Sequence, residues 1–178
     1  MPPEEGGIAA GNLERYNQGN MAAAPSIKIE RLFISPGHNF FGHHRLPPGD
    51  HLTIEVKEVE CVAGRGLTGD RFFNFKEDYK GQVTFFAAEV FEEVCARLNA
   101  GDKSPGVTRR NIVTRGVDLN SLIGREFEIQ GVRFEGTAEC SPCHWMNEAI
   151  APGAEPALHG RGGLRAKILS TGKLHVES

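Results

Sequence analysis

Apolar and polar residues alternate along several short segments of the chain, a pattern typical of half-buried β-strands. The predicted strands are Ile27–Ile34, Thr53–Cys61, Gln82–Phe86, Asn111–Thr114, Glu126–Gln130, Val132–Gly136, Leu164–Leu169 and Leu174–Val176. Within the second strand the alternation of apolar and polar residues shifts by one position between Val56 and Val59, which predicts a β-bulge. The last two strands are expected to form a hairpin across residues 170–172.

One segment follows a helical period instead. Apolar residues of Ala87–Ala100 recur at i, i+3, i+4 and i+7, and Gly101 is expected to end this amphipathic helix. Many short strands with few helices predict a mostly β fold, a β-barrel rather than an alternating βαβ sheet. Residues 1–25 are rich in Gly, Ala and Pro without periodicity, so we expect a disordered N-terminal extension followed by a single domain over residues 26–178.

Composition narrows the class of protein. The 178 residues suffice for one domain with a real core, and no apolar stretch approaches the length of a membrane span. The N-terminus lacks the basic-then-apolar order of a secretory signal, so a cytoplasmic location is expected. A net charge of −3 argues against a general nucleic-acid binder and against a polybasic membrane anchor. Residues 103–117 and 156–176 nevertheless each carry basic residues and no acid, which favours local anion binding.

The cysteine segment Cys140-Ser-Pro-Cys143 is the main candidate for chemistry. A chain of this size without a secretion signal is expected to keep its four cysteines as free thiols. A structural zinc site needs four ligands, and only one Cys-x-x-Cys pair is present. A redox dithiol is a second interpretation, and a single reactive thiolate or soft metal ligand at Cys143 is a third. Both cysteines could also simply fill space beneath Trp145.

Three further segments combine arginine with glycine or asparagine. They are Gly66–Arg71, Arg109–Thr114 and His159–Arg165. Guanidinium groups and closely approaching backbone amides hold anions, although each segment could equally be a turn with solvated charges. The histidines between His38 and His51 are unevenly spaced around two prolines, which favours a solvated or substrate-side loop over a metal site.

Together these segments resemble a MOSC domain, the domain named for the C-terminal part of molybdenum cofactor sulfurases. The resemblance rests on GLTGDRFF (66–73), QVT (82–84), RRNIVTRGVDLNSLIG (109–124), GTAECSPCHWM (136–146) and GRGGLRAKIL (160–169), in order. It implies a β-barrel fold of the small stand-alone type. The pyridoxal-phosphate-dependent desulfurase domain of the sulfurases has no counterpart in this chain, so pyridoxal phosphate is not expected here.

The resemblance also implies roles for particular residues. Cys143 matches the family's characteristic cysteine, which is proposed to carry persulfide sulfur or to bind the molybdenum of the pterin cofactor. Arg109 and Asn111 match an Arg-x-Asn-Ile-Val segment that contacts the cofactor in amidoxime reductases of the superfamily. The expected cofactor-binding residues are Arg71, Arg109, Arg110, Asn111, Arg161, Gly162 and Gly163, with Cys143 as the catalytic residue and metal ligand.

Two functions follow from this resemblance. In the first, the protein carries the molybdenum cofactor and reduces N-hydroxylated compounds, with Cys143 as metal ligand and an electron-donor protein as partner. In the second, Cys143 accepts persulfide sulfur from a separate cysteine desulfurase and delivers it to a metal centre. A thiol redox protein and an anion-binding adaptor that does not use Cys143 are the remaining alternatives.

Overall fold

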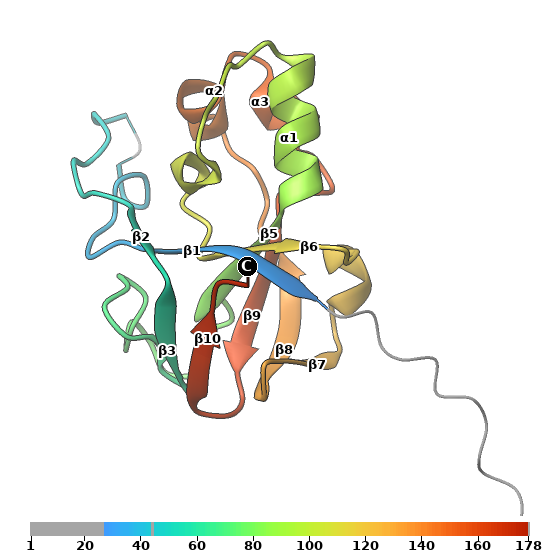
Figure 1. Ribbon diagram of the computed structural model, residues 1–178. Coiled ribbons are helices and arrows are strands. Elements are labelled where there is room, and N and C mark those ends of the chain that lie inside the picture. Colours follow the sequence, from blue (N-terminus) through green and yellow to red (C-terminus); the bar gives the residue numbers. More distant parts are fainter. Residues whose placement is uncertain (1–26, 44, 178) are drawn as a thin grey trace, which may run out of the picture.

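The computed structural model describes residues 27–43 and 45–177 (Figure 1). The predicted disordered extension, residues 1–25, lies outside these residues. The described part of the chain forms ten strands: β1 (Lys28–Ile34), β2 (Ile54–Val56), β3 (Glu58–Val62), β4 (Gly66–Leu67), β5 (Val83–Ala87), β6 (Ile112–Arg115), β7 (Glu126–Ile129), β8 (Val132–Glu139), β9 (Leu164–Ile168) and β10 (Gly172–His175). Three α-helices accompany them: α1 (Ala88–Arg97), α2 (Trp145–Ala149) and α3 (Ala154–Ala157). The mostly β fold with a few helices is therefore confirmed.

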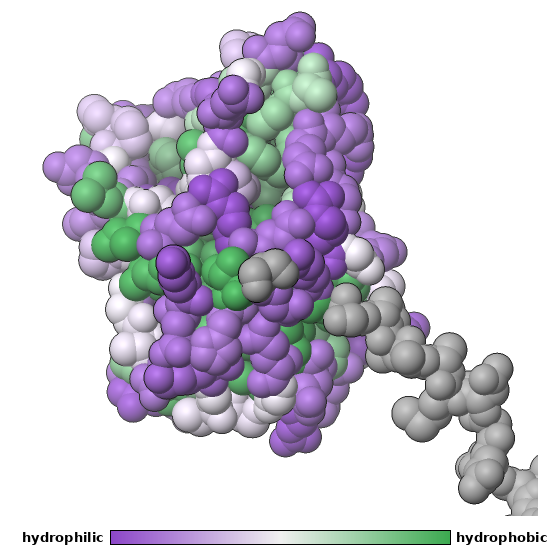
Figure 2. All heavy atoms as spheres, in the orientation of Figure 1, coloured by the Kyte–Doolittle hydropathy of each residue, from purple (hydrophilic) through white to green (hydrophobic). Residues whose placement is uncertain are grey.

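The strands lie in two sheets. The larger has the order β2-β1-β6-β5-β9-β8-β7 and the smaller the order β10-β3-β4. The inward side chains of both sheets share one apolar core, which includes Leu32, Cys61, Phe85 and Phe134. Hydrophilic residues cover most of the molecular face shown in Figure 2. The expected barrel is not closed: β2 and β7 remain the two edges of the larger sheet, and no pairing joins them in the described residues.

The shift in alternation near Lys57 does not correspond to the predicted bulge. The chain bends there, so that β2 pairs with β1 in the larger sheet and β3 pairs with β10 and β4 in the smaller one. The predicted C-terminal hairpin is also wrong. β9 pairs with β5 and β8, whereas β10 pairs with β3 in the other sheet. In both places the chain passes from one sheet to the other, which local alternation of side chains does not reveal.

The predicted amphipathic helix is confirmed as α1, which is shorter than the expected 87–100. It ends at Leu98 because Asn99 adopts a left-handed conformation, with φ of 51°. The amides of Asn99 and Ala100 then donate to the carbonyls of Ala96 and Cys95, which satisfies the last turn. Asn99 and not Gly101 therefore stops the helix.

The helices gather at one end of the larger sheet (Figure 1). There α1, α2 and α3 enclose a second apolar cluster that includes Phe86, Phe91, Val94 and Ile150. None of the helices in the described residues has the length and apolar character needed to cross a membrane. Cys140–Cys143 lies in the loop that connects β8 of the larger sheet to α2 of this helical end.

Candidate functional site

A cavity of about 360 Å³ lies beside the cysteine segment. Among the residues that the structure describes, four arginines line it, Arg71, Arg109, Arg110 and Arg165, and no aspartate or glutamate does. Its aromatic and sulfur-containing lining comprises His38, Phe40, Phe41, Phe72, Tyr79, Cys140, Cys143, His144, Trp145 and Met146. An acid-free arginine wall concentrates positive potential, so the cavity suits an anionic ligand with a flat apolar part.

Cys143 is the accessible thiol of this cavity. Its side chain is exposed, whereas Cys61 and Cys140 are buried and Cys95 is half-buried. The chain from Cys140 to Cys143 forms no turn, and α2 begins two residues later at Trp145. Cys140 is buried and Cys143 is exposed, so the two thiols differ in their access to a reagent or a partner. The arrangement favours a single reactive thiol over a Cys140–Cys143 pair.

This difference in exposure gives a direct prediction for thiol reactivity. Burial raises the pKa of Cys61 to about 12, and it also raises the pKa of Cys95. Because the thiolate is the reactive form, we expect only Cys143 to react rapidly with Ellman's reagent in the folded protein. Cys143→Ser should remove the rapid phase while all remaining thiols still react in urea. A rapid phase of unchanged amplitude in Cys143→Ser would contradict this assignment.

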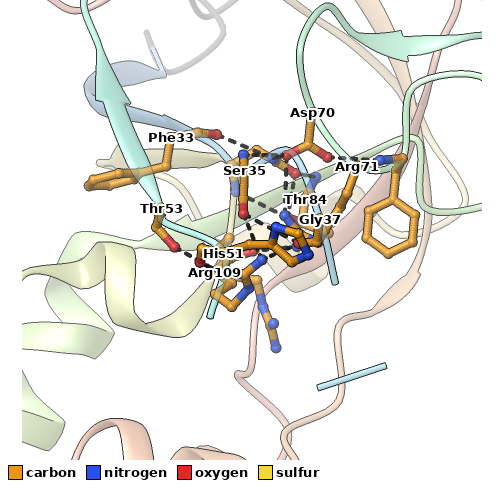
Figure 3. Close-up of polar contacts among 12 residues, drawn as sticks. Phe33, Ser35, Gly37, His51, Thr53, Asp70, Arg71, Thr84 and Arg109 are labelled. Atoms are coloured by element: carbon orange, nitrogen blue, oxygen red, sulfur yellow. Dashed lines mark hydrogen bonds and ion pairs between the residues drawn. The ribbon is translucent and has the colours of Figure 1, made fainter. Parts of the chain in front are cut away.

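Arg109 is placed to hold the loop that forms one wall of the cavity. It adopts a left-handed conformation, with φ of 57°, and is 7% exposed. Its Nη2 donates to Ser35 Oγ at 2.7 Å and to the Gly37 carbonyl at 2.5 Å. Its Nη1 donates to the His51 carbonyl at 3.1 Å and to Thr53 Oγ1 at 3.2 Å (Figure 3). Both ends of the loop between β1 and β2 therefore converge on one guanidinium group.

The electrostatics of Arg109 follow from this burial. Desolvation, and then the neighbouring charge of Arg71, lower the pKa of Arg109 to about 10. The group is thus still charged at neutral pH. Its four hydrogen bonds to the protein leave little of its donor capacity for a ligand, so its main contribution is to position the loop.

Asn111 lies at the centre of a buried polar network and is 2% exposed. Its Oδ1 accepts from the amide of Thr84 at 3.1 Å and from its hydroxyl at 2.9 Å. Its Nδ2 donates to the Phe33 carbonyl at 3.2 Å and to Asp70 Oδ2 at 3.0 Å. These four bonds tie together β1, the turn after β4 and β5. Asn111 does not line the cavity, whereas Arg109 and Arg110, which precede it in the sequence, do.

Arg71 reaches the cavity from the turn after β4. Its Nη1 pairs with Asp70 Oδ2 at 3.2 Å, and its Nη2 donates to the Arg109 carbonyl at 3.0 Å. The guanidinium carbon lies 4.9 Å from the centre of the Phe72 ring. Burial lowers the pKa of Arg71, and the charge of Asp70 opposes this effect. Arg71 therefore presents an oriented positive charge to the cavity.

Arg165 is a cavity residue that the sequence interpretation did not single out. It lies on β9 and lines the same cavity as Cys140. Burial, the largest single cause, works against its charge, but Cys140 and Tyr79 together raise the pKa of Arg165. The available signal was its position two residues after Gly163 in a basic segment without acids. Sequence alone could not distinguish it from Arg161 in the same segment.

Arg110 and the two glycines before β9 contact the backbone of the cysteine segment and hold it in place. Arg110 donates to the carbonyls of Gly162 at 3.1 Å and Cys140 at 3.0 Å, and the Cys140 amide donates to the Gly163 carbonyl at 2.7 Å. A Cβ atom on Gly162 would overlap the Cys140 carbonyl oxygen, and one on Gly163 would overlap that of Phe85. These glycines allow two backbone segments to approach each other, a packing role that needs no ligand.

Arg161 is not brought together with Cys143 or with the other predicted arginines. Its guanidinium group forms a bidentate ion pair with Glu93 on α1, with N–O distances of 2.6 and 2.8 Å. It lines a separate small crevice and not the cavity that contains Cys143. Its contacts therefore connect the loop before β9 to α1.

The described histidines of the loop between β1 and β2 occupy different environments. His38 lines the cavity, Nδ1 of His43 lies 2.8 Å from the Pro47 carbonyl, and the His51 backbone is bound by Asn39. His44 lies outside the described residues. Within those residues, no group of three or more His, Cys, Asp or Glu side chains is arranged to hold a metal ion.

Residues 68–177 match the MOSC domain. The chain belongs to the MOSC domain family. This family is associated with the molybdenum cofactor through the sulfurases for which it is named. Among curated proteins, no sequence matches this MOSC chain at a significant level.

Solved structures of similar fold include three from bacteria. The YuaD protein from Bacillus subtilis aligns with a TM-score of 0.64 and 18% identity over 84% of this chain and 91% of that chain. YiiM from Geobacillus stearothermophilus aligns with a TM-score of 0.60 and 13% identity over 84% and 71%. YiiM from Escherichia coli aligns with a TM-score of 0.53 and 18% identity over 68% and 60%. At these identities the likeness concerns the fold alone.

The donor set of the cavity fits the pterin-based molybdenum cofactor that the family implies. An exposed thiol is a soft ligand of the kind that molybdenum accepts, and an acid-free arginine wall suits the cofactor's phosphate. Aromatic side chains give the cavity flat apolar surfaces. Asn111 and Arg161 do not contribute to this fit, since neither lines the cavity.

Proposed function

We propose that this MOSC protein binds the molybdenum cofactor and reduces N-hydroxylated compounds, with Cys143 as the protein ligand of the metal. The observation that carries the proposal is the exposed Cys143 thiol at a cavity lined, within residues 27–43 and 45–177, by arginines and by no acidic residue. When bound, the cofactor supplies the change in metal oxidation state that reduction requires. An electron-donor protein is the expected partner, and the four free thiols support a reducing, cytoplasmic location.

We assign each residue at the cavity a separate part in binding the cofactor. Arg71 and Arg165 supply positive charge to the cofactor phosphate, and Arg110 holds the backbone on which Cys140 lies. Arg109 keeps both ends of the loop between β1 and β2 in place. Trp145 lines the cavity with Cys143 and stacks on Phe40, with 4.9 Å between the ring centres, so the pair offers a flat apolar surface to the cofactor. Asn111 connects β1 and β5 through its buried hydrogen bonds to Phe33 and Thr84.

The test of this function is turnover. Protein produced with an ample supply of cofactor should reduce a hydroxylaminopurine or an amidoxime to the amine with a chemical or protein electron donor. Product is measured by chromatography against a control that lacks the electron donor. Cofactor-loaded protein that produces no amine from either substrate would overturn the reductase function.

A second function, persulfide transfer, is favoured by the exposure of Cys143. A cysteine desulfurase can deliver sulfur only to a thiol that it can reach, and Cys143 is the exposed thiol of the four. Incubation with a desulfurase and cysteine should then add the mass of one sulfur atom to the peptide that contains Cys143. Persulfide formation without amine production would select this function over the first.

A further inference from the structure

His38 is held rigidly in the cavity wall by its two chain neighbours. The Gly37 carbonyl accepts from Arg109 at 2.5 Å. On the other side, Asn39 Nδ2 donates to the His51 carbonyl at 2.9 Å, and the His51 amide donates back to Asn39 Oδ1 at 3.0 Å. The imidazole between these anchored residues is half-buried and faces the cavity.

The imidazole ring is positioned by aromatic contacts and not by hydrogen bonds. Its centre lies 4.9 Å from that of Phe72, 5.3 Å from that of Phe41 and 5.8 Å from that of Phe75. In the part of the chain that the structure describes, neither ring nitrogen of His38 has a hydrogen-bond partner, whereas Nδ1 of His43 lies 2.8 Å from the Pro47 carbonyl. The ring nitrogens of His38 are therefore available to a ligand or to solvent.

The charge of His38 depends on the arginines around it. Burial, and then the charge of Arg71, lower the pKa of His38 below its ordinary 6.5, and Arg109 and His51 act in the same direction. Asp70 opposes them but is already paired with Arg71. An anion on the arginine wall would cancel part of this positive potential and so favour the protonated ring. By reciprocity, protonation of His38 would strengthen the binding of that anion.

We propose that His38 is the proton donor of the cavity: it takes up a proton when an anionic ligand occupies the arginine wall, and it delivers that proton to the oxygen that leaves an N-hydroxylated substrate. Reduction of a hydroxylamine to an amine breaks the N–O bond, consumes two electrons and two protons, and releases the oxygen as water. The electrons come from the electron-donor protein, and His38 supplies one of the protons. This second half rests on the reductase function proposed above, whereas anion-coupled protonation does not.

The first experiment uses the cofactor-free protein and inorganic sulfate, an anion whose charge is constant over the pH range titrated. The pKa of His38 is measured by NMR with and without saturating sulfate, and His38→Gln identifies its resonances. We expect sulfate to raise this pKa by about one unit and, reciprocally, to bind about tenfold more tightly at acid than at alkaline pH. His43→Gln, a change in the same loop outside the cavity lining, should leave both results unchanged.

The second experiment measures amine formation by cofactor-loaded protein as a function of pH. His38→Gln should lower kcat and remove the pH dependence assigned to His38, with little change in KM. Absence of sulfate binding, or binding that leaves the pKa of His38 unmoved, would overturn the proposal. Wild-type turnover that His38→Gln matches at every pH would overturn the proton-donor role and leave the reductase function standing. A sulfate-dependent pKa in a protein that reduces no substrate would instead overturn the reductase function.

Discussion

Replacing Cys143 by serine is expected to lower the rate of amine formation at least about a hundredfold while the protein stays folded. Residues that merely support a metal ligand already contribute 10–100-fold, so loss of the ligand itself belongs at or beyond the upper end of that range. The side chain is exposed and packs in neither apolar cluster, so its replacement should leave the urea unfolding midpoint unchanged.

Cys95→Ser provides the matched control for this result. Cys95 lies on α1, away from the cavity lining, and its replacement changes the same atom in the same way. Amine formation should remain near the wild-type rate in Cys95→Ser. Activity in Cys143→Ser within a few-fold of that control would show that reduction does not need the Cys143 thiol as a metal ligand.

Replacing Asn111 by alanine is expected to lower the free energy of unfolding by about 3 kcal/mol. The substitution leaves the Thr84 amide, the Phe33 carbonyl and one oxygen of Asp70 without this partner inside the protein. Each buried polar group that loses its partner costs about 1–3 kcal/mol, and whole domains are stable by only about 5–15 kcal/mol. Urea unfolding followed by fluorescence or circular dichroism measures the difference.

Thr114→Val is the control on the adjoining strand. Thr114 is fully buried on β6, and within the described residues its Oγ1 is the buried side-chain polar atom that lacks a partner. Its replacement removes no hydrogen bond and should change stability by less than about 0.5 kcal/mol, or raise it. Equal stability losses in Asn111→Ala and Thr114→Val would contradict the structural role of Asn111. An Asn111→Ala protein that is stable but fails to retain pterin would support the cofactor contact that the family resemblance implies for Asn111.

The sequence contained most of the fold because alternation and helical period are local signals. α1 and the strands on either side of it follow from side-chain spacing alone. The errors at Lys57 and at residues 169–171 arise where the chain changes sheets. A strand that leaves one sheet for the other keeps its alternation, so only long-range pairing distinguishes a bulge or a hairpin from a crossing.

The candidate site was predictable in its residue types but not in their roles. Arginine, asparagine and glycine near a reactive cysteine indicate an anion site, and the structure does place Arg71 and Cys143 at one cavity. Sequence does not show whether a polar side chain is already satisfied by the protein, as it is for Asn111. Nor does it show that Arg161 pairs with Glu93 while Arg165, four residues later in the sequence, reaches the cavity.

The presence of molybdenum and pterin in the purified protein is the most direct test of the account. Wild-type protein produced under cofactor-replete conditions is analysed for metal by mass spectrometry and for pterin by fluorescence after oxidation, beside Cys143→Ser prepared identically. The account predicts close to one molybdenum and one pterin per wild-type chain, with the molybdenum lost in Cys143→Ser. Wild-type protein that contains neither, or a Cys143→Ser variant that retains both in full, would contradict it.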